Sequence, residues 1–354
     1  MGKICKQRRN LLMKALVYEG PRRLNMREMP EPVPGPDEVV IKVAYSGICG
    51  SELGGYLGEN SLRKPPLVMG HEFSGEIVGL GSNVAQHKPG LAVGQPVTVN
   101  PLIHCGWCRA CLAGRFNLCR SREILGIHRP GSYADLVKAP AALVYALPPS
   151  MSLEHAALAE PVGCAVRAAR LAGCAPGTTL LVTGLGPIGL LVAQVAQTFG
   201  VAQIFATDTD PDRRAIAEQV GLRVLNPLTD DVVAITQAAT DGYGVDAAID
   251  AVGLTVTRRQ CIDAVARGGR VILVGLHAAD SEVQGNDIIR KEVRIEGSFA
   301  YAPLDFDEAF KWLATGHVQI DPWLMKAPLS EGQACFERLL SQPGPVAKIL
   351  LYSH

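Results

Sequence analysis

The sequence predicts an α/β protein built from an antiparallel, barrel-like domain and a doubly wound parallel-sheet domain. The chain has 354 residues, which is enough for two domains of ordinary size. As far as about residue 150, short runs of strand-forming residues are separated by glycine and proline, which is typical of an antiparallel barrel. Beyond residue 178, strand-like and helix-like runs alternate, which is typical of a doubly wound parallel sheet.

The barrel-like domain is expected to begin at Met13 and to include residues 13–160, after a disordered N-terminal extension of residues 1–12. Four prolines between residues 30 and 37 indicate a turn, because proline cannot donate to the hydrogen-bond ladder of an interior strand. The strands of this domain are predicted at residues 14–18, 38–45, 73–79 and 96–99.

The parallel-sheet domain is expected to comprise residues 161–301, and a helix is predicted at 151–171. Residues 302–354 are expected to pack back on the first domain, because they end in a predicted strand at 346–351. The strands of the parallel sheet are predicted at residues 179–183, 203–207, 223–226, 245–250, 271–275 and 293–299. The helices between them are predicted at 188–199, at 212–220, from about 230, and at 258–266.

Composition narrows the class of protein. The formal net charge is zero, which disfavours a nucleic-acid binder. The N-terminus lacks a secretory signal, so we expect a reducing, cytoplasmic location in which clustered cysteines indicate metal binding. Residues 171–207 contain no charge, but their glycines and prolines favour a buried strand and helix over a membrane span. We therefore expect neither a nucleic-acid nor a membrane partner.

Four cysteines, Cys105, Cys108, Cys111 and Cys119, have the spacing C-x2-C-x2-C-x7-C. Four thiolates at such short intervals suit a tetrahedral structural zinc ion. An iron–sulfur cluster and four unligated cysteines are weaker alternatives, because the spacing differs from that of iron–sulfur proteins. A closed four-thiolate site has no position for substrate, so this zinc should shape a loop and take no part in chemistry.

A glycine-rich turn with the spacing G-x-G-x-x-G follows the predicted strand 179–183 and opens the next helix. The turn comprises Gly184, Gly186, Pro187, Ile188 and Gly189. Its glycines allow a tight turn and close approach of the backbone to a pyrophosphate, which the helix N-terminus attracts. This context predicts a dinucleotide-binding site.

Asp208 at the end of the following strand predicts NAD rather than NADP, because an acid there binds ribose hydroxyls and repels a 2′-phosphate. Arg213 lies close enough in sequence to weaken that preference. Two further turns follow strands that end at the same edge of the sheet, where ligands bind. They contribute the candidate cofactor residues Val252, Gly253, Val274, Gly275 and Leu276.

Cys49, His71 and Glu72 are candidate ligands of a second zinc ion, but they lie on separate loops and their spacing alone does not establish a shared site. A lone cysteine is usually a small core residue, and a lone histidine usually has a structural role. Glu160 is also a candidate, because it lies among apolar residues. A zinc ion with mixed sulfur, nitrogen and oxygen ligands and one open position would be catalytic.

Several motifs occur together in one order: residues 47–52, residues 70–75, the four-cysteine segment, residues 159–161 and the glycine turn. With this set, the chain from residue 13 to residue 351 resembles the zinc-dependent medium-chain dehydrogenases, in the branch of sorbitol and galactitol-1-phosphate dehydrogenases. The resemblance implies a GroES-like catalytic domain and a Rossmann NAD-binding domain, with the active site in the cleft between them. It also implies one catalytic and one structural zinc ion per subunit, and a homodimer or homotetramer formed through Rossmann-domain edges.

The resemblance assigns roles to individual residues. Cys49 and His71 would bind zinc, and Glu72 and Glu160 would be the two carboxylates near the metal, without deciding which binds it directly. Ser51 matches the hydroxyl that first takes the proton of the alcohol. The substrate pocket is expected to include Tyr56, Phe73 and Tyr301 beside Ser51.

Two departures from the family pattern matter. Glu52 stands where the family usually has aspartate, an acid that orients the zinc-binding histidine, so its geometry is open. Sorbitol dehydrogenases carry an Arg-Tyr pair where this chain has Ala300-Tyr301, which argues against sorbitol itself as the substrate.

We therefore expect a zinc-dependent oxidoreductase that transfers hydride between NAD and a secondary alcohol of a polyol, sugar or sugar phosphate. The alternatives are an amino-alcohol or simple secondary-alcohol dehydrogenase of the same fold, a non-catalytic NAD(H)-binding redox sensor, and an interaction module built on the zinc lobe. The joint presence of Cys49, Ser51 and His71 disfavours the redox sensor, and the zero net charge and the dinucleotide-binding half disfavour the interaction module.

Overall fold

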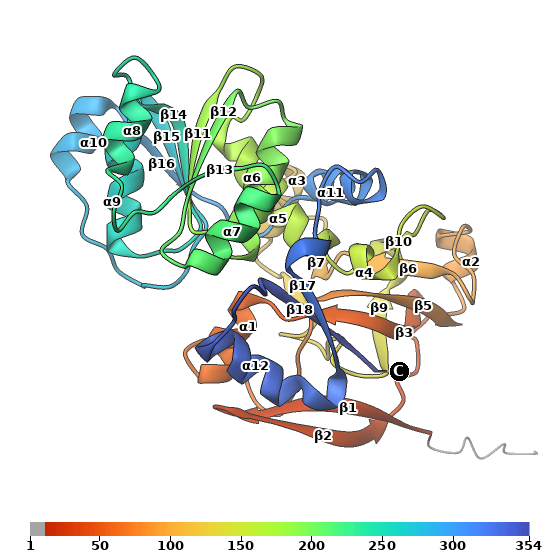
Figure 1. Ribbon diagram of the computed structural model, residues 1–354. Helices are drawn as coiled ribbons and strands as arrows, with labels where there is room; N and C mark the ends of the chain where they lie inside the picture. Colours follow the sequence, from red (N-terminus) through yellow and green to blue (C-terminus); the bar gives the residue numbers. More distant parts are fainter. Residues whose placement is uncertain (1–10, 354) are drawn as a thin grey trace, which may run out of the picture.

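The computed structural model describes residues 11–353, which form a domain of antiparallel strands and a domain with a parallel sheet (Figure 1). The first domain is built on a seven-stranded sheet with the order β10-β6-β5-β3-β18-β17, in which β9 also pairs with β3. The strands of this sheet are β3 (Glu38–Gly47), β5 (Glu72–Leu80), β6 (Pro96–Val99), β9 (Leu136–Pro140), β10 (Val144–Ala146), β17 (Leu324–Pro328) and β18 (Lys348–Tyr352).

Two smaller sheets complete the first domain. A three-stranded sheet consists of β1 (Leu12–Gly20), β2 (Arg23–Pro30) and β4 (Leu67–Val68). A two-stranded sheet, β7 (Leu102–Ile103) and β8 (Glu123–Ile124), flanks the four-cysteine segment. Because β1 begins at Leu12, the ordered chain starts before Met13, and the part of the expected disordered extension at residues 1–10 lies outside the described residues.

The strand predicted at 346–351 is observed as β18, and it pairs with strands of the first domain. It pairs antiparallel with β3 through Leu350 and Leu351 and parallel with β17. The β17–β18 pair is an exception to the expected antiparallel arrangement. It arises because α12 (Gly332–Ser341) connects the two strands and returns the chain in the same direction.

The second domain is a six-stranded parallel sheet with the order β13-β12-β11-β14-β15-β16. This order confirms the predicted doubly wound sheet. Its strands are β11 (Thr179–Thr183), β12 (Gln203–Thr207), β13 (Arg223–Leu225), β14 (Val245–Asp250), β15 (Val265–Leu273) and β16 (Arg294–Gly297).

Helices cover both faces of the parallel sheet (Figure 1). Alternate residues of β11 point to opposite faces: Leu180 packs in one buried cluster with α5 and α6, and Leu181 packs in another with α8 and α9. The α-helices of the whole protein are α1 (Gly50–Leu57), α2 (Val84–His87), α3 (Arg109–Leu112), α4 (Leu153–Ala156), α5 (Ala159–Ala172), α6 (Pro187–Thr198), α7 (Pro211–Gln219), α8 (Val232–Ala238), α9 (Thr255–Ala264), α10 (Gly285–Lys291), α11 (Pro303–Ala314) and α12.

The single helix predicted at 151–171 is wrong, because the segment forms α4 and α5 separately. Ser152 caps α4 by accepting the His155 N–H, and α5 begins at Ala159. Pro161 then lies in the first turn of α5, where its missing N–H leaves no hydrogen bond unmade. This start places Glu160 at the beginning of α5.

The charge-free segment 171–207 forms β11, α6 and β12, so its apolar composition reflects burial inside the parallel-sheet domain. No helix among residues 11–353 is long and apolar enough to cross a membrane. The strand ends that matter for function are those of β3, β11, β12, β14 and β15, which place the candidate residues described next.

Candidate active site

The end of β3 and the start of β5 bring Cys49 and Glu72 together. Gly47, the last residue of β3, lies opposite Glu72 in the antiparallel register. A Cβ at residue 47 would come within 2.2 Å of the Glu72 carboxylate, so glycine is needed there. Cys49 then caps the N-terminus of α1, and His71 follows Gly70, whose φ of 96° turns the chain into β5.

The structure brings Cys49, His71 and Glu72 into one cluster. Their candidate ligand atoms, a sulfur, an imidazole nitrogen and a carboxylate oxygen, all lie within 4.8 Å of one another. Cys49 is half-buried, whereas His71 and Glu72 are buried. Mixed sulfur, nitrogen and oxygen donors at this separation suit a tetrahedral zinc ion with one position left for a fourth ligand. Glu160 does not belong to this cluster.

Glu52 orients His71. One oxygen of the buried Glu52 carboxylate lies 2.9 Å from His71 Nδ1 and 2.9 Å from the Gly70 nitrogen, and the other accepts the Cys49 N–H at 3.1 Å. The Tyr133 hydroxyl also donates to Glu52. Burial opposes ionisation of Glu52, but His71 and the surrounding donors lower its pKa to about 2. The glutamate therefore reaches the histidine despite its extra methylene, and Nδ1 is held so that Nε2 remains for a metal.

Lys348 on β18 binds the Glu72 carboxylate from the other side. Its ammonium lies 2.9 and 2.7 Å from the two oxygens and also donates to the Ile48 carbonyl. Both side chains are buried. Burial disfavours the charged lysine, but Glu72 and Cys49 raise the pKa of Lys348 above its usual value. The C-terminal strand thus supplies the cation that fixes Glu72.

Glu160 lies at the edge of the cluster, in the first turn of α5. Burial raises the pKa of its carboxyl to about 7, with His71 opposing the shift and Glu72 adding to it. The Cys164 thiol donates to it over 3.8 Å. The buried Tyr301 hydroxyl lies near Glu160 but has no hydrogen bond of normal geometry among the described residues.

Ser51 lies in the first turn of α1, beside Cys49. Its hydroxyl donates to the Cys49 sulfur at 3.3 Å and accepts an N–H of Arg63 at 3.1 Å. A serine oxygen has two lone pairs, so one acceptor position remains for a substrate hydroxyl.

The balance of buried charge fits a divalent metal. Glu52, Glu72, Glu160 and the Cys49 thiol, which binds metals as a thiolate, provide four potential negative charges. Lys348 and Arg63 provide two positive charges. A zinc ion would supply the remaining two, so the residues present fit the metal in both donor type and charge.

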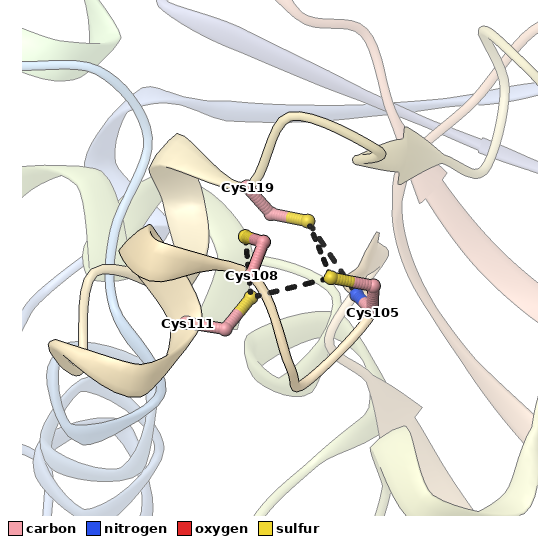
Figure 2. A group of neighbouring side chains, drawn as sticks. All are labelled: Cys105, Cys108, Cys111 and Cys119. Atoms are coloured by element: carbon pink, nitrogen blue, oxygen red, sulfur yellow. Dashed lines mark hydrogen bonds between the residues drawn. The ribbon is translucent and has the colours of Figure 1, made fainter.

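Cys105, Cys108, Cys111 and Cys119 also converge, in the segment that contains α3 (Figure 2). This segment, residues 105–119, is called the four-cysteine lobe. The Cys108 and Cys111 sulfurs are 3.5 Å apart, as are those of Cys105 and Cys119. Backbone N–H groups, of Cys111 first and then of Arg120, lower the pKa of the Cys108 thiol to about 6. This cluster could hold a structural zinc ion with four thiolates.

The lobe is attached to the segment that leads to Tyr301. The Asn117 side-chain amide donates to the Phe299 carbonyl at 2.8 Å, and the Arg122 guanidinium lies 4.3 Å from the centre of the Phe299 ring. The lobe therefore supports the position of Tyr301 beside Glu160.

The glycine turn has the geometry expected of a phosphate-binding loop. Gly184 has a φ of 87°, and a Cβ at Gly189 would lie 1.7 Å from the Gly184 carbonyl oxygen. Gly186 caps α6, with Pro187 and Ile188 in its first turn. Asp208, at the end of β12, accepts the Leu185 N–H at 2.7 Å and so ties its own position to the turn.

Arg213 lies with one guanidinium nitrogen 3.7 Å from the Asp208 carboxylate. The two later turns meet backbone to backbone, since a Cβ at Gly253 would lie 2.4 Å from the Gly275 carbonyl group. Asp250 organises the first turn by accepting the N–H groups of Val252 and Gly253 at 3.0 Å. In the second turn, Val274 and Gly275 are half-buried, whereas Leu276 is 83% exposed.

Two expected pocket residues lie elsewhere. Tyr56 is fully buried between α1 and α12, where it donates to Glu337 at 2.6 Å and packs on Phe336. Phe73 lies in the core of the first domain. Their placement in the pocket was wrong, because adjacency to a motif does not determine which face of a helix or strand a side chain occupies.

Sequence reasoning also missed Arg63, Tyr133 and Lys348. Lys348 carries a recognisable signal, since a single cation opens an otherwise apolar strand and such a residue is rarely buried without a partner. Arg63 lies in a polar loop sequence that resembles an ordinary solvent-exposed connection, so the sequence gives no indication of its position.

Comparisons with known proteins agree with this geometry. The family model described as "Alcohol dehydrogenase GroES-like domain" matches residues 35–149, and that described as "Zinc-binding dehydrogenase" matches residues 187–315. L-galactonate-5-dehydrogenase of Escherichia coli (strain K12) is 34% identical over 88% of this chain and 90% of its own length. The chain belongs to the zinc-binding dehydrogenase family.

Further relatives support the same assignment. Sorbitol dehydrogenase of Bacillus subtilis (strain 168) is 33% identical over 96% of this chain and 97% of its own. A zinc-binding dehydrogenase of Sinorhizobium meliloti 1021, solved with NADP bound, superposes with a TM-score of 0.88 at 32% identity and covers 97% of this chain and 99% of its own. The expected fold class is confirmed, and the protein is a zinc-dependent oxidoreductase of the polyol dehydrogenase type that uses a nicotinamide dinucleotide.

Substituting Glu52 tests whether it positions His71. Glu52→Gln should lower zinc affinity at the Cys49 cluster by about 10- to 100-fold, because the histidine loses its anionic partner. The four-cysteine lobe should keep its zinc. Competition titration with a chromogenic chelator measures both sites, and Glu76→Gln on the exposed side of β5 is the matched control. Unchanged affinity at both sites in Glu52→Gln would contradict the positioning role.

The raised pKa of Glu160 predicts a pH effect in metal-free protein. Its pKa of about 7 in the folded protein exceeds the usual glutamate pKa of 4.5, so the folded state holds the proton more tightly. The resulting stabilisation is complete below pH 4.5 and is lost as the pH rises through 7. Thermal unfolding of metal-free protein from pH 5 to 8 should show a smaller fall for Glu160→Gln than for wild type. Equal pH dependence in both proteins would exclude this explanation.

Proposed function

We propose that the residues around Cys49 catalyse the oxidation of a secondary alcohol of a polyol, sugar or sugar phosphate to a ketone, with NAD as the hydride acceptor. The observation that carries the proposal is the cluster of Cys49, His71 and Glu72 with the Ser51 hydroxyl beside it. When bound there, zinc supplies a Lewis acid for the alcohol oxygen, and NAD accepts the hydride.

Each residue has a separate task in this proposal. Cys49, His71 and Glu72 hold the metal, and Glu52 fixes the histidine ring through Nδ1. Ser51 would take the proton of the substrate hydroxyl on its free lone pair and release its own hydroxyl proton to a ribose hydroxyl of the cofactor. Glu160 lies at the edge of the cluster as a second carboxylate. Separately, a structural zinc ion is held by Cys105, Cys108, Cys111 and Cys119.

The cofactor is proposed to lie along the carboxyl ends of the parallel strands. Backbone N–H groups of Gly186, Ile188 and Gly189 receive its pyrophosphate at the start of α6. Asp208 favours NAD, because its carboxylate would accept ribose hydroxyls and repel a 2′-phosphate. Arg213 lies beside that carboxylate and reduces the discrimination. The turns containing Val252, Gly253, Val274, Gly275 and Leu276 are proposed to contact the adenine and the nicotinamide, mainly through backbone atoms.

The domain boundaries remain a proposal: the catalytic domain would comprise residues 13–160 and 302–354, and the NAD-binding domain residues 161–301. Strands β17 and β18 support the return of the tail, whereas α11, which also follows residue 301, packs with α5 in the core of the parallel-sheet domain. A cytoplasmic location likewise stays a prediction.

NAD reduction by the zinc-loaded protein is the first experiment. It should be measured across polyols, aldonates, sugar phosphates, cyclitols and amino alcohols. One of these classes should be oxidised, and Cys49→Ser should abolish the reaction because the metal loses a ligand. Cys335→Ser, a buried cysteine outside the site, is the control. NAD binding with full zinc and no turnover on any class would instead favour the redox-sensor alternative.

We propose a homodimer or homotetramer formed through β16. This strand is the edge of the parallel sheet, and all four of its residues are exposed. An exposed edge is a template for pairing with a second copy. Ile295→Glu should shift the protein to monomer in analytical ultracentrifugation, whereas Leu228→Glu, at a 75% exposed residue on another surface, should not. A monomeric wild type at micromolar concentration would contradict the proposal.

A further inference from the structure

Arg63 is a buried arginine whose side chain ends at the proposed proton-transfer serine. It lies in the loop after α1 and is only 4% exposed. Its stem crosses α1 at Gly55, where a Cβ would come within 2.2 Å of Arg63 Cδ. Gly55 and Ser51 are one helical turn apart, so the guanidinium lies along α1 and donates to the Ser51 oxygen at 3.1 Å. The glycine thus provides the space that this side chain occupies.

The guanidinium is incompletely paired. Its Nε is buried and has no hydrogen-bond partner among the described residues. No carboxylate in residues 11–353 lies within 4.0 Å of it. Arginine is rarely buried without a partner, because burial of an unpaired charge is costly. The described residues therefore leave the Nε donor of Arg63 without an acceptor.

Glu52 does not fill that role. Its negative charge and the positive charge of Arg63 attract one another, which contributes to the low pKa of Glu52. However, the Glu52 oxygens already accept from His71, Gly70, Cys49 and Tyr133. Glu52 balances the charge of Arg63 from a distance but offers it no hydrogen bond.

Open space lies beside Ser51 on α1. Gly54 follows Ser51 by three residues and so shares its face of the helix. A Cβ built at Gly54 would meet no atom within 4 Å, and the same is true at Gly50. A ligand next to Ser51 therefore has room along α1 at Gly54, and Ser51 itself contacts the Arg63 guanidinium.

We propose that Arg63 binds an anionic group of the substrate, a carboxylate or a phosphate, a few bonds from the alcohol that is oxidised. The inference deepens the proposed function, on which it rests, by restricting the substrate to acidic derivatives of polyols and sugars. Carboxylate and phosphate share the oxygen geometry that a guanidinium fork binds. The anion supplies a hydrogen-bond acceptor that the Arg63 guanidinium lacks among the described residues.

Calorimetric binding to zinc-loaded protein saturated with NADH tests the proposal without turnover, since NADH cannot accept hydride. The probes are galactitol, galactitol 1-phosphate and L-galactonate, which share one six-carbon skeleton and differ in charge. At least one anionic probe should bind about 10- to 100-fold more tightly than galactitol, the range expected for one hydrogen bond to a charged group. The two anionic probes distinguish phosphate from carboxylate recognition.

Variants identify the residue responsible. Arg63→Met keeps the stem and should remove the preference for the anionic probe. Arg63→Lys keeps the charge but loses the fork, so it should retain an intermediate preference. Arg27→Met removes an exposed arginine on β2 and should behave as wild type. Circular dichroism and zinc content verify that each variant is folded, and Arg63→Lys keeps the test valid should Arg63→Met not fold.

Three results would overturn the inference: equal binding of all three probes to wild type, an unchanged preference in Arg63→Met, or weakened NADH binding as the only effect of that variant. Failure of the Arg63 inference can be distinguished from failure of the proposed dehydrogenase function. Oxidation of neutral and anionic alcohols with equal efficiency would remove the role of Arg63 and leave the dehydrogenase intact. Tight anion binding that depends on Arg63, without any NAD reduction, would support the role of Arg63 and contradict the proposed dehydrogenase activity.

Discussion

Buried charge near Cys49 is the constraint on which the surrounding structure depends. Glu52, Glu72 and Glu160 are all buried within one region, and each carboxylate excluded from water requires donors or a cation. Backbone N–H groups at the start of α1 and before β5 serve Glu52, and the C-terminal strand brings Lys348 to Glu72. Glu160 accepts only the long hydrogen bond from the Cys164 thiol among the described residues, and its pKa stays raised. The arrangement becomes fully compensated when a divalent ion occupies the cluster.

The glycine turns at the carboxyl ends of the parallel strands follow a different principle. They present backbone groups, because glycine at positions 184, 189, 253 and 275 lets the turns approach one another and a ligand closely. The carboxylates of Asp208 and Asp250 hold these turns in place by accepting backbone N–H groups. The first domain thus contributes ionic chemistry, and the second contributes a rigid backbone surface.

Much of the fold was predictable, because hydrophobic periodicity records local structure: β11, β12 and β14 have the predicted bounds. The four-cysteine cluster was predictable because its ligands are close in sequence. Contacts between distant segments were not, since Lys348 and Glu72 are 276 residues apart and Arg63 lies in a segment with no periodicity. The errors at Tyr56 and Phe73 have a related cause, because the direction of a side chain depends on how whole elements pack. The family resemblance supplied the ligand set, which spacing alone left open.

The position of Lys348 has a consequence for biosynthesis. The chain leaves the ribosome from its N-terminus, so Cys49, His71 and Glu72 emerge while β18 is still unmade. Until the last residues are released, the strand next to β3 is missing and Glu72 has no ammonium partner. The nascent first half therefore exposes an open sheet edge and an incompletely compensated cluster of ligands. The complete arrangement around Glu72 therefore exists only after β18 has been synthesised and has paired with β3.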